Sequence, residues 1–283
     1  MTDGVLAASV PIHPAATAML LRDGGQGLEV FMVQRTHSAS FARSQFVFPG
    51  GRVDEADHAD FEPVCDGIDD ATASSRLGLV AGGLAWLVAA IRECFEEAGV
   101  LLARHRDGGG IVRFDAPDAS ARFASARREI HAGRRSLVDL CTAENLLLLA
   151  GEMHVVAHWV TPVGERRRFD TRFFVARAPE AQEPLHDDNE TIASLWVRPA
   201  DALAQWERRE MQMFPPTVAS LRHLDQFATA DDAIDAARRA GVPPVLVPRL
   251  VLDDAGRFVD IVLPGDDRYE STPVPDYVMG TGR

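Results

Sequence analysis

Short β-prone runs alternate with longer amphipathic runs along the chain, and this alternation predicts a fold of mixed strands and helices. Near the N-terminus two apolar runs flank a glycine-rich turn at residues 23–27, which is typical of two neighbouring strands. The predicted strands cover residues 17–22, 29–34, 46–48, 154–161, 172–177 and 193–198, with two shorter ones at 246–252 and 258–263.

Apolar residues recur at helical spacing between Leu84 and Phe95, which predicts a helix from about residue 84 to residue 98. Gly99 stands where helices commonly end in a left-handed residue. Residues 104–149 are expected to be mostly helical, and three shorter helices are predicted near 199–207, 217–227 and 231–240. The expected fold class is therefore α/β or α+β.

An acidic stretch from Arg52 to Ala73 interrupts this alternation, and we expect it to be a solvated insertion. The whole chain is acidic as well, with a net charge of -13. This charge argues against broad nucleic-acid binding, because such binding needs Lys and Arg to displace counterions. An anionic substrate would have to be attracted by bound metal ions or by a local group of arginines.

The longest uncharged apolar run, Leu77 to Ile91, is too short for a membrane span and is better interpreted as a buried helix. Cys65, Cys94 and Cys141 are widely spaced and form no CxxC motif. An odd number of such cysteines is typical of reduced thiols. We therefore expect a cytoplasmic protein that has no membrane partner.

The segment from Arg92 to Val100 carries the most informative chemistry. On a helix Glu93, Glu96 and Glu97 fall at i, i+3 and i+4, so three carboxylates share one face and repel one another. A divalent cation would offset this repulsion, and oxygen ligands favour Mg²⁺ or Mn²⁺. The alternative is an ordinary solvated acidic face of a helix.

Gly50-Gly51 and the segment Arg92-Glu93-Cys94-Phe95-Glu96-Glu97-Ala98-Gly99-Val100 together resemble the Nudix box, GX5EX7REUXEEXGU, in which U is a bulky apolar residue. The second half matches at every specified position, with Cys94 as the loosest match. The two halves are separated differently from the family pattern. Gly51 and Arg92 lie 41 positions apart instead of 14, an excess of 27 residues. The box glutamate falls on Asp57 when counted from Gly51 and on Leu84 when counted back from Arg92.

An interrupted box of this kind resembles the peroxisomal coenzyme A diphosphatases of the Nudix superfamily. Further matching motifs are Gln34-Arg35, Phe41, Phe46-Val47-Phe48-Pro49-Gly50-Gly51, Trp159-Val160-Thr161-Pro162 and Arg167-Arg168-Phe169-Asp170-Thr171-Arg172-Phe173-Phe174. The resemblance covers about residues 15–225, and the chain ends in Thr281-Gly282-Arg283 instead of a peroxisomal tripeptide, so a cytoplasmic location is expected.

The resemblance implies a Nudix fold, in which a mixed β-sheet lies between helices. It implies one Nudix hydrolase domain at residues 1–228, with insertions at about 52–83 and 104–149, and a C-terminal extension at 229–283 that packs on the domain. The chemistry implied is attack of a metal-activated water on a diphosphate. Three sets of site residues follow: metal ligands Glu93, Glu96, Glu97 and the Gly51 carbonyl; catalytic residues Glu93, Arg92 and Glu190; and substrate-binding residues Arg35, Arg167 and Arg168.

Several of these residues also have a plain structural interpretation. Glu190 lies in a polar segment that could be only a turn, and the run Arg166–Arg168 could simply solvate the start of a strand. His154 and His158 share one face of a predicted strand, where packing is the commoner role. Arg92 is expected to orient the glutamates by an ion pair, and its alternative is an exposed pair with Glu96.

The leading functional hypothesis is hydrolysis of coenzyme A or acyl-CoA, with Mg²⁺ or Mn²⁺ as cofactor. Two alternatives remain: a hydrolase of ADP-ribose or of a dinucleotide, and a catalytically silent module that binds a nucleotide. The three intact glutamates argue against the silent module. The expected partner is a small-molecule nucleoside diphosphate substrate, without nucleic acid or membrane, and a homodimer is left open.

Overall fold

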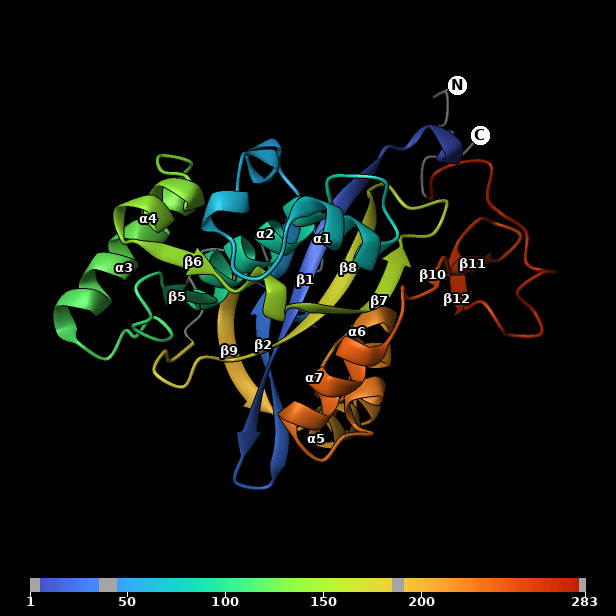
Figure 1. The fold of residues 1–283 in the computed structure, drawn as a ribbon. Coiled ribbons are helices and arrows are strands. Elements are labelled where there is room, and N and C mark those ends of the chain that lie inside the picture. Colours follow the sequence, from blue (N-terminus) through green and yellow to red (C-terminus); the bar gives the residue numbers. More distant parts are fainter. Residues whose placement is uncertain (1–5, 36–44, 185–190, 280–283) are drawn as a thin grey trace.

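The computed structural model describes residues 6–35, 45–184 and 191–279, and it is built around one large mixed β-sheet (Figure 1). The eight-stranded sheet runs in the order β10-β7-β8-β1-β2-β3, with β4 paired to β1 and β9 paired to β2. Its strands are β1 (Ile12–Gly24), β2 (Gly27–Arg35), β3 (Phe46–Val47), β4 (Gly50–Arg52), β7 (His154–Val160), β8 (Arg168–Arg177), β9 (Thr191–Val197) and β10 (Val245–Leu246).

The central strand β1 shows why both faces of this sheet are covered. Side chains alternate across a strand, and the two sets of β1 residues join different cores. Ala16, Ala18 and Leu20 belong to the first core, whereas Met19 and Leu21 belong to the second. β1 is antiparallel to β2 and parallel to β8, so the sheet is mixed.

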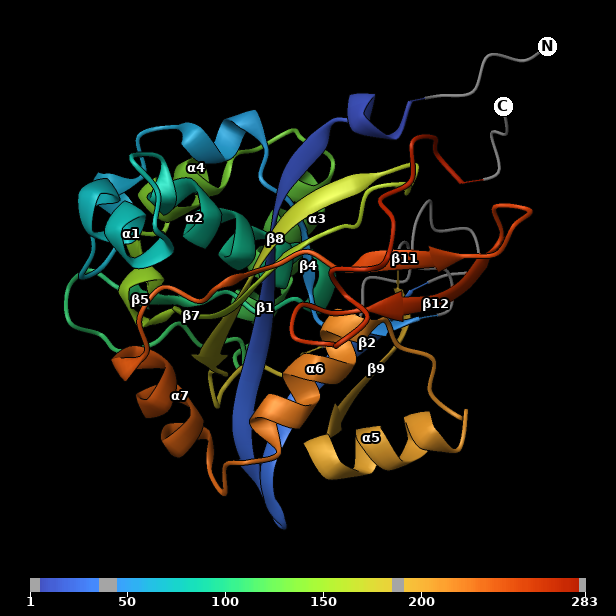
Figure 2. The ribbon, with the colours of Figure 1, turned by 90° about the vertical axis from the view of Figure 1, so that its right-hand side faces the viewer.

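Helices cover both faces of the sheet, as Figures 1 and 2 show. The first core holds residues of α1 (Asp70–Leu77), α2 (Gly83–Glu93), α3 (Pro117–His131) and α4 (Leu137–Ala143). The second core holds residues of α5 (Pro199–Glu207), α6 (Pro215–Leu224) and α7 (Ala230–Arg239). The remaining elements are η1 (Ala7–Ser9), η2 (Glu55–His58), η3 (Glu62–Val64), η4 (Cys94–Ala98), η5 (Ala150–Glu152), β5 (Ala103–His105), β6 (Leu146–Leu148), β11 (Arg249–Leu252) and β12 (Phe258–Val262).

The predicted mixed fold is confirmed, but two predicted helical segments differ from the structure. Residues 104–149 contain α3 and α4, yet β5 and β6 also pair there as a small antiparallel sheet. The run Leu146–Leu148 supplies β-compatible apolar residues, which a helical interpretation of the whole segment overlooked. The helix expected over 84–98 is an α-helix only to Glu93, and residues Cys94–Ala98 form a π-helical turn.

Most acidic side chains of the segment after Arg52 are exposed, as its composition predicts, but the segment also packs on the domain through other residues. Asp57 is only 3% exposed, and α1 packs on α2 with Ala73 and Leu77 in the first core. Asp70 accepts hydrogen bonds from the backbone N–H groups of Gly82 and Leu84, and so caps the start of α2. Several carboxylates of this acidic segment therefore serve as helix caps or ion-pair partners. The acidic composition alone does not reveal these roles.

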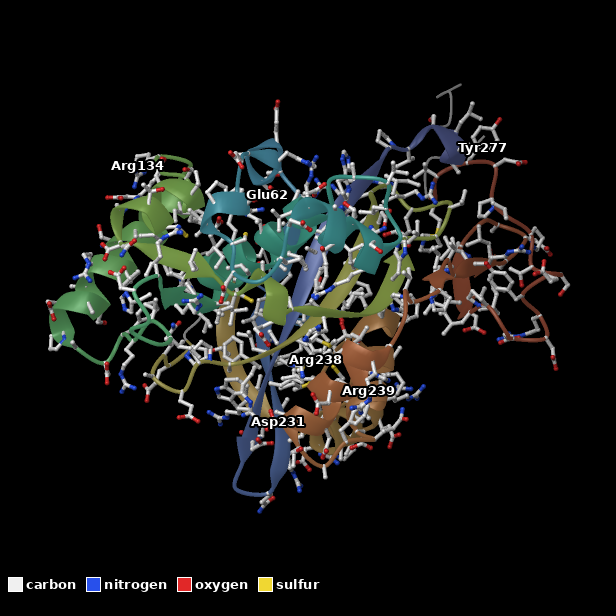
Figure 3. The ribbon with its side chains drawn as sticks, in the orientation of Figure 1. Glu62, Arg134, Asp231, Arg238, Arg239 and Tyr277 are labelled. Carbon is white, nitrogen blue, oxygen red and sulfur yellow. The ribbon has the colours of Figure 1, made fainter. Side chains whose placement is uncertain are left out.

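The chain after residue 228 contributes directly to the sheet and its second core. Ala233, Ile234 and Ala237 of α7 are buried there, and β10 pairs with β7. Figure 3 marks the two ends of α7 by Asp231 and Arg238. β11 and β12 form a separate two-stranded sheet, and the predicted division at residue 228 stays a prediction. None of the described helices is long and apolar enough to cross a membrane.

Candidate active site

The acidic face of the Nudix-like segment is formed where α2 passes into the π-helical turn η4. Ile91, Phe95 and Ala98 are fully or almost fully buried and anchor this helix in the first core. In a π-helical turn the backbone hydrogen bonds join residues i and i+5 instead of i and i+4, and such turns are often found at functional sites. The turn ends at Gly99, whose φ of 69° lies in the left-handed region that glycine adopts without strain.

The glycine pair meets this helix, although 41 residues separate Gly51 from Arg92. The Gly50 N–H donates to Glu97 Oε2 at 3.0 Å, and Arg35 Nη1 donates to Glu97 Oε1 at 3.2 Å. A Cβ built on Gly51 would lie 2.3 Å from Glu93 Oε1, so only glycine lets that carboxylate approach the strand so closely. The two halves of the split box therefore lie together in space.

Arg92 lies at the centre of a network of carboxylates. Its Nε and Nη2 donate to the two oxygens of Asp57, both at 2.9 Å, and Nη2 also donates to the Arg52 carbonyl. Nη1 donates to Glu93 at 2.8 Å and to Glu96 at 3.2 Å. The Arg92 side chain is only 11% exposed, so the alternative of an exposed pair with Glu96 is wrong. Arg92 therefore forms ion pairs with both Glu93 and Glu96.

Asp57 is the position that counting from Gly51 gives for the box glutamate, and it lies beside the second half of the box. Leu84, the other position that counting offers, is buried among apolar side chains of the first core. Asp57 is instead directed at Arg92 and forms a bidentate pair with it. An acid near the first half of the box therefore reaches the second half, despite the 27 extra residues.

The electrostatics of the cluster favour a bound cation. The pKa of Glu93 is raised to about 8, first by burial and then by the charges of Glu97 and Glu96, against the opposing effect of Arg92. Buried oxygen ligands that destabilise one another in this way fit a hard divalent ion, which would offset the repulsion. Within residues 6–35, 45–184 and 191–279, no three His, Cys, Asp or Glu side chains converge as a ready-made metal cluster. The glutamates are instead held by Arg35, Arg92 and the Gly50 N–H.

Two residues of α3 also reach the site, and no sequence motif pointed to them. Arg127 Nε donates to the Glu96 carbonyl at 2.9 Å, and His131 Nδ1 lies 3.4 Å from Glu96 Oε2. Both lie in the segment 104–149, which the sequence suggested to be an insertion. Only the tertiary placement of α3 brings them to Glu96.

The remaining predicted site residues, Arg167, Arg168 and Glu190, either lie away from this cluster or fall outside the described residues. Arg168 is 7% exposed, and its Nε donates to the carbonyl of Thr161, the residue that follows β7. Arg172 of β8 is in register with Ala16 of β1, and Ala16 is in register with Gly51 of β4. Arg168 lies four positions from Arg172 along β8. Four positions on a strand span about 13 Å. Arg167 is exposed, and Glu190 lies outside the described residues.

The two histidines of β7 do not share a face as expected. The register shifts between Val155 and Ala157, which breaks the alternation of side chains. His158 lies against Asp170, whereas His154 lines a cavity of about 220 Å³ between α1, α2, β7 and the end of α7. Neither histidine reaches the glutamates in the described contacts.

Comparison with known proteins agrees with this geometry. A family model described as the NUDT19 Nudix domain matches residues 67–224, just over half of the chain. The chain is 28% identical to acyl-coenzyme A diphosphatase NUDT19 of Homo sapiens, over 98% of this chain and 82% of that protein. The Gallus gallus protein of the same name is 27% identical, over 87% of this chain and 74% of its own length.

A solved structure shows the same architecture. The crystal structure of a Nudix hydrolase from Alicyclobacillus acidocaldarius is 28% identical to the chain and superposes with a TM-score of 0.64. The match covers 83% of this chain and 100% of that one.

Proposed function

The chain belongs to the NUDT19 Nudix domain family, and on this basis we propose that it hydrolyses the diphosphate of coenzyme A or of an acyl-coenzyme A. The protein is a Nudix hydrolase. The observation that carries the proposal is the meeting of Gly50 and Gly51 with Glu93 and Glu97 across the split box. The substrate class rests on the relatives named acyl-coenzyme A diphosphatase.

Members of this superfamily use divalent metal ions, and the residues of the site fit such an ion. Glu93, Glu96 and Glu97 would hold it, and the Gly51 carbonyl is proposed as a further ligand because the Gly51 backbone lies close to the Glu93 carboxylate. A bound Mg²⁺ or Mn²⁺ would polarise the diphosphate and make water a stronger nucleophile. We propose Mg²⁺ or Mn²⁺ because all the available ligands are oxygens.

In the proposed reaction water attacks one phosphorus and the bridging P–O bond breaks. The products are a 3′,5′-bisphosphorylated adenosine and a phosphopantetheine derivative. Arg92 keeps Glu93 and Glu96 oriented, while Arg35 and the Gly50 N–H hold Glu97. Both arginines are already paired with carboxylates, so the charge that attracts an anionic substrate to this acidic chain would come mainly from the bound metal ion.

The two alternatives differ in the site features that they require. A silent nucleotide-binding module would not need three carboxylates that repel one another in a buried cluster, and this argues against it. Hydrolysis of ADP-ribose or a dinucleotide would use the same glutamates, because the metal site does not encode the rest of the substrate. We therefore retain that activity as the second candidate.

We further propose a cytoplasmic location. The three cysteines are free thiols in the structure, and two of them, Cys94 and Cys141, are buried. Free thiols are typical of a reducing compartment, which supports this proposal.

A substrate panel tests the proposed activity directly. The purified protein would be incubated with coenzyme A, acetyl-coenzyme A, ADP-ribose and a diadenosine polyphosphate, with Mg²⁺ or Mn²⁺. Products would be identified by mass, and ¹⁸O-labelled water would show which phosphorus is attacked. Faster cleavage of ADP-ribose than of the coenzyme A derivatives would move the assignment to the second candidate.

A further inference from the structure

Helix α3 packs against η4, the π-helical turn that continues α2 and carries Glu96; α2 and η4 together are called the catalytic helix below. Its residues Phe123, Ala126 and Ile130 are buried in the first core, which also contains Ile91 and Phe95. These three apolar residues lie at helical spacing, so one face of α3 is anchored. The same orientation brings the polar residues Arg127 and His131 of α3 to the site. In Figure 3 the label of Arg134 marks the turn that follows α3.

Arg127 binds the backbone of the catalytic helix at Glu96. Carbonyls in the last turn of a helix lack partners within the helix and carry the negative end of its dipole. Arg127 Nε satisfies one of them by donating to the Glu96 carbonyl at 2.9 Å. The guanidinium also covers Gly99, where an added Cβ would lie 2.9 Å from Arg127 Nη1. Gly99 is therefore required both for its left-handed φ and for the close approach of Arg127.

His131 approaches the side-chain carboxylate of Glu96. Its Nδ1 lies 3.4 Å from Glu96 Oε2, while Arg92 Nη1 lies 3.2 Å from Glu96 Oε1. Glu96 is thus held at its carbonyl by α3, and its carboxylate lies between a residue of α3 and a residue of α2. A carboxylate has about four acceptor positions, so these two contacts leave room for a metal ion.

We propose that α3 is part of the active site, and that Arg127 and His131 are positioning residues that set the orientation of Glu96 toward the metal. This inference rests on the proposed function of Glu96 as a metal ligand. Groups that hold a metal ligand in place fix its direction, and their removal commonly weakens metal binding by about 10–100-fold. Arg127 holds Glu96 by its backbone carbonyl, and His131 faces its carboxylate. The segment 104–149 then supplies two side chains without which the site is incomplete.

Direct binding of Mn²⁺ to the full-length protein tests this inference without a substrate. Free Mn²⁺ can be followed by its electron paramagnetic resonance signal during titration. Arg127→Ala is expected to raise the Kd for Mn²⁺ by about 10-fold, and His131→Ala to raise it as well. Arg127→Lys, which retains a cationic donor, should recover part of the loss. Arg128→Ala is the matched control, because Arg128 is the exposed neighbour on the same helix.

A double-mutant cycle separates positioning from a general loosening of the fold. If Arg127 and His131 act through Glu96, neither variant should weaken Mn²⁺ binding further in a Glu96→Gln background. An equal fold-change in both backgrounds would overturn the inference, since α3 would then only support the fold. An unchanged Kd in both α3 variants, or no Mn²⁺ binding by the unmodified protein, would overturn it too. Tight Mn²⁺ binding without cleavage of coenzyme A would refute the proposed substrate alone.

Discussion

Asp57 and Arg92 are joined by two hydrogen bonds of 2.9 Å, one to each carboxylate oxygen, across 35 positions of the sequence. The Asp57 side chain is 2% exposed and that of Arg92 is 11% exposed, so the pair is shielded from water. Through its third nitrogen Arg92 also holds Glu93 and Glu96. The pair therefore connects the segment after Gly51 to the orientation of the glutamates.

Asp57→Asn should destabilise the protein as well as lower its activity. Breaking a buried ion pair on one side leaves an uncompensated charge, which commonly costs about 3–5 kcal/mol. We expect about 3 kcal/mol, because Arg92 keeps Glu93 and Glu96 as partners. Urea unfolding measures this loss. Asp54→Asn is the control, since Asp54 is 57% exposed and 3.7 Å from Arg92; its loss should stay below about 1 kcal/mol.

Glu96→Gln should lower turnover by at least about 100-fold, or about 3 kcal/mol of activation free energy. The substitution relieves repulsion between like charges but also removes one charged partner of Arg92, so the two contributions offset and the unfolding free energy of the metal-free protein should change little. Steady-state kinetics with Mg²⁺ and thermal unfolding in a chelator measure the two effects. Near-native turnover in this variant and in Glu97→Gln would rule out the metal-ligand assignment.

The neighbouring glycines should respond differently to alanine. A Cβ on Gly51 would meet the Glu93 carboxylate, the movable end of a side chain, whereas a Cβ on Gly50 would lie 2.6 Å from the Ala16 carbonyl. Gly51→Ala is therefore expected to reduce kcat with little loss of stability. Gly50→Ala should lower the unfolding free energy by about 1–3 kcal/mol, as overpacking against fixed atoms does. Equal stability losses in both variants would contradict this difference.

His154 should contribute to the pH dependence of stability. Burial lowers the pKa of His154 below its ordinary value of 6.5, and the charges of Arg238 and Arg76 act in the same direction. Below pH 6.5 the unfolded chain then binds more protons than the folded one, so stability falls as the pH falls. Urea unfolding of the parent and of His154→Gln at pH 7.5 and pH 5 measures the effect. The parent should lose more stability between the two pH values, and an identical loss would contradict the prediction.

Local motifs and tertiary placement explain which parts of the site the sequence predicts. Glu93, Glu96 and Glu97 share a helix face because of their spacing alone, so they could be found without a structure. Asp57 could be found only by counting from Gly51, since the extra residues obscure its link to Arg92. Arg127 and His131 reach Glu96 only because Phe123, Ala126 and Ile130 bury one face of α3. Packing between segments distant in sequence decides that contact, and it leaves no local pattern.

The last prediction concerns the basic run Arg166–Arg168 and the 3′-phosphate that distinguishes coenzyme A from dephospho-coenzyme A. Arg167 is exposed, whereas Arg168 is buried and donates to the Thr161 carbonyl. A guanidinium can bind phosphate oxygens through two hydrogen bonds, and such bonds to charged groups are worth about 1.5–3 kcal/mol. We therefore expect Arg167→Ala to lower kcat/KM for coenzyme A more than for dephospho-coenzyme A, by a free-energy difference in that range.

Arg168→Ala is the comparison variant, because it removes a buried hydrogen-bond donor at the position that follows Arg167. It should lower the unfolding free energy and reduce kcat/KM for both substrates by the same factor, since its contact is with the backbone of the protein. Kinetics of the two variants with both substrates, at one ionic strength, measure the difference. If Arg167→Ala reduces both activities equally, this run does not recognise the 3′-phosphate, and the group that does must lie elsewhere around the glutamates.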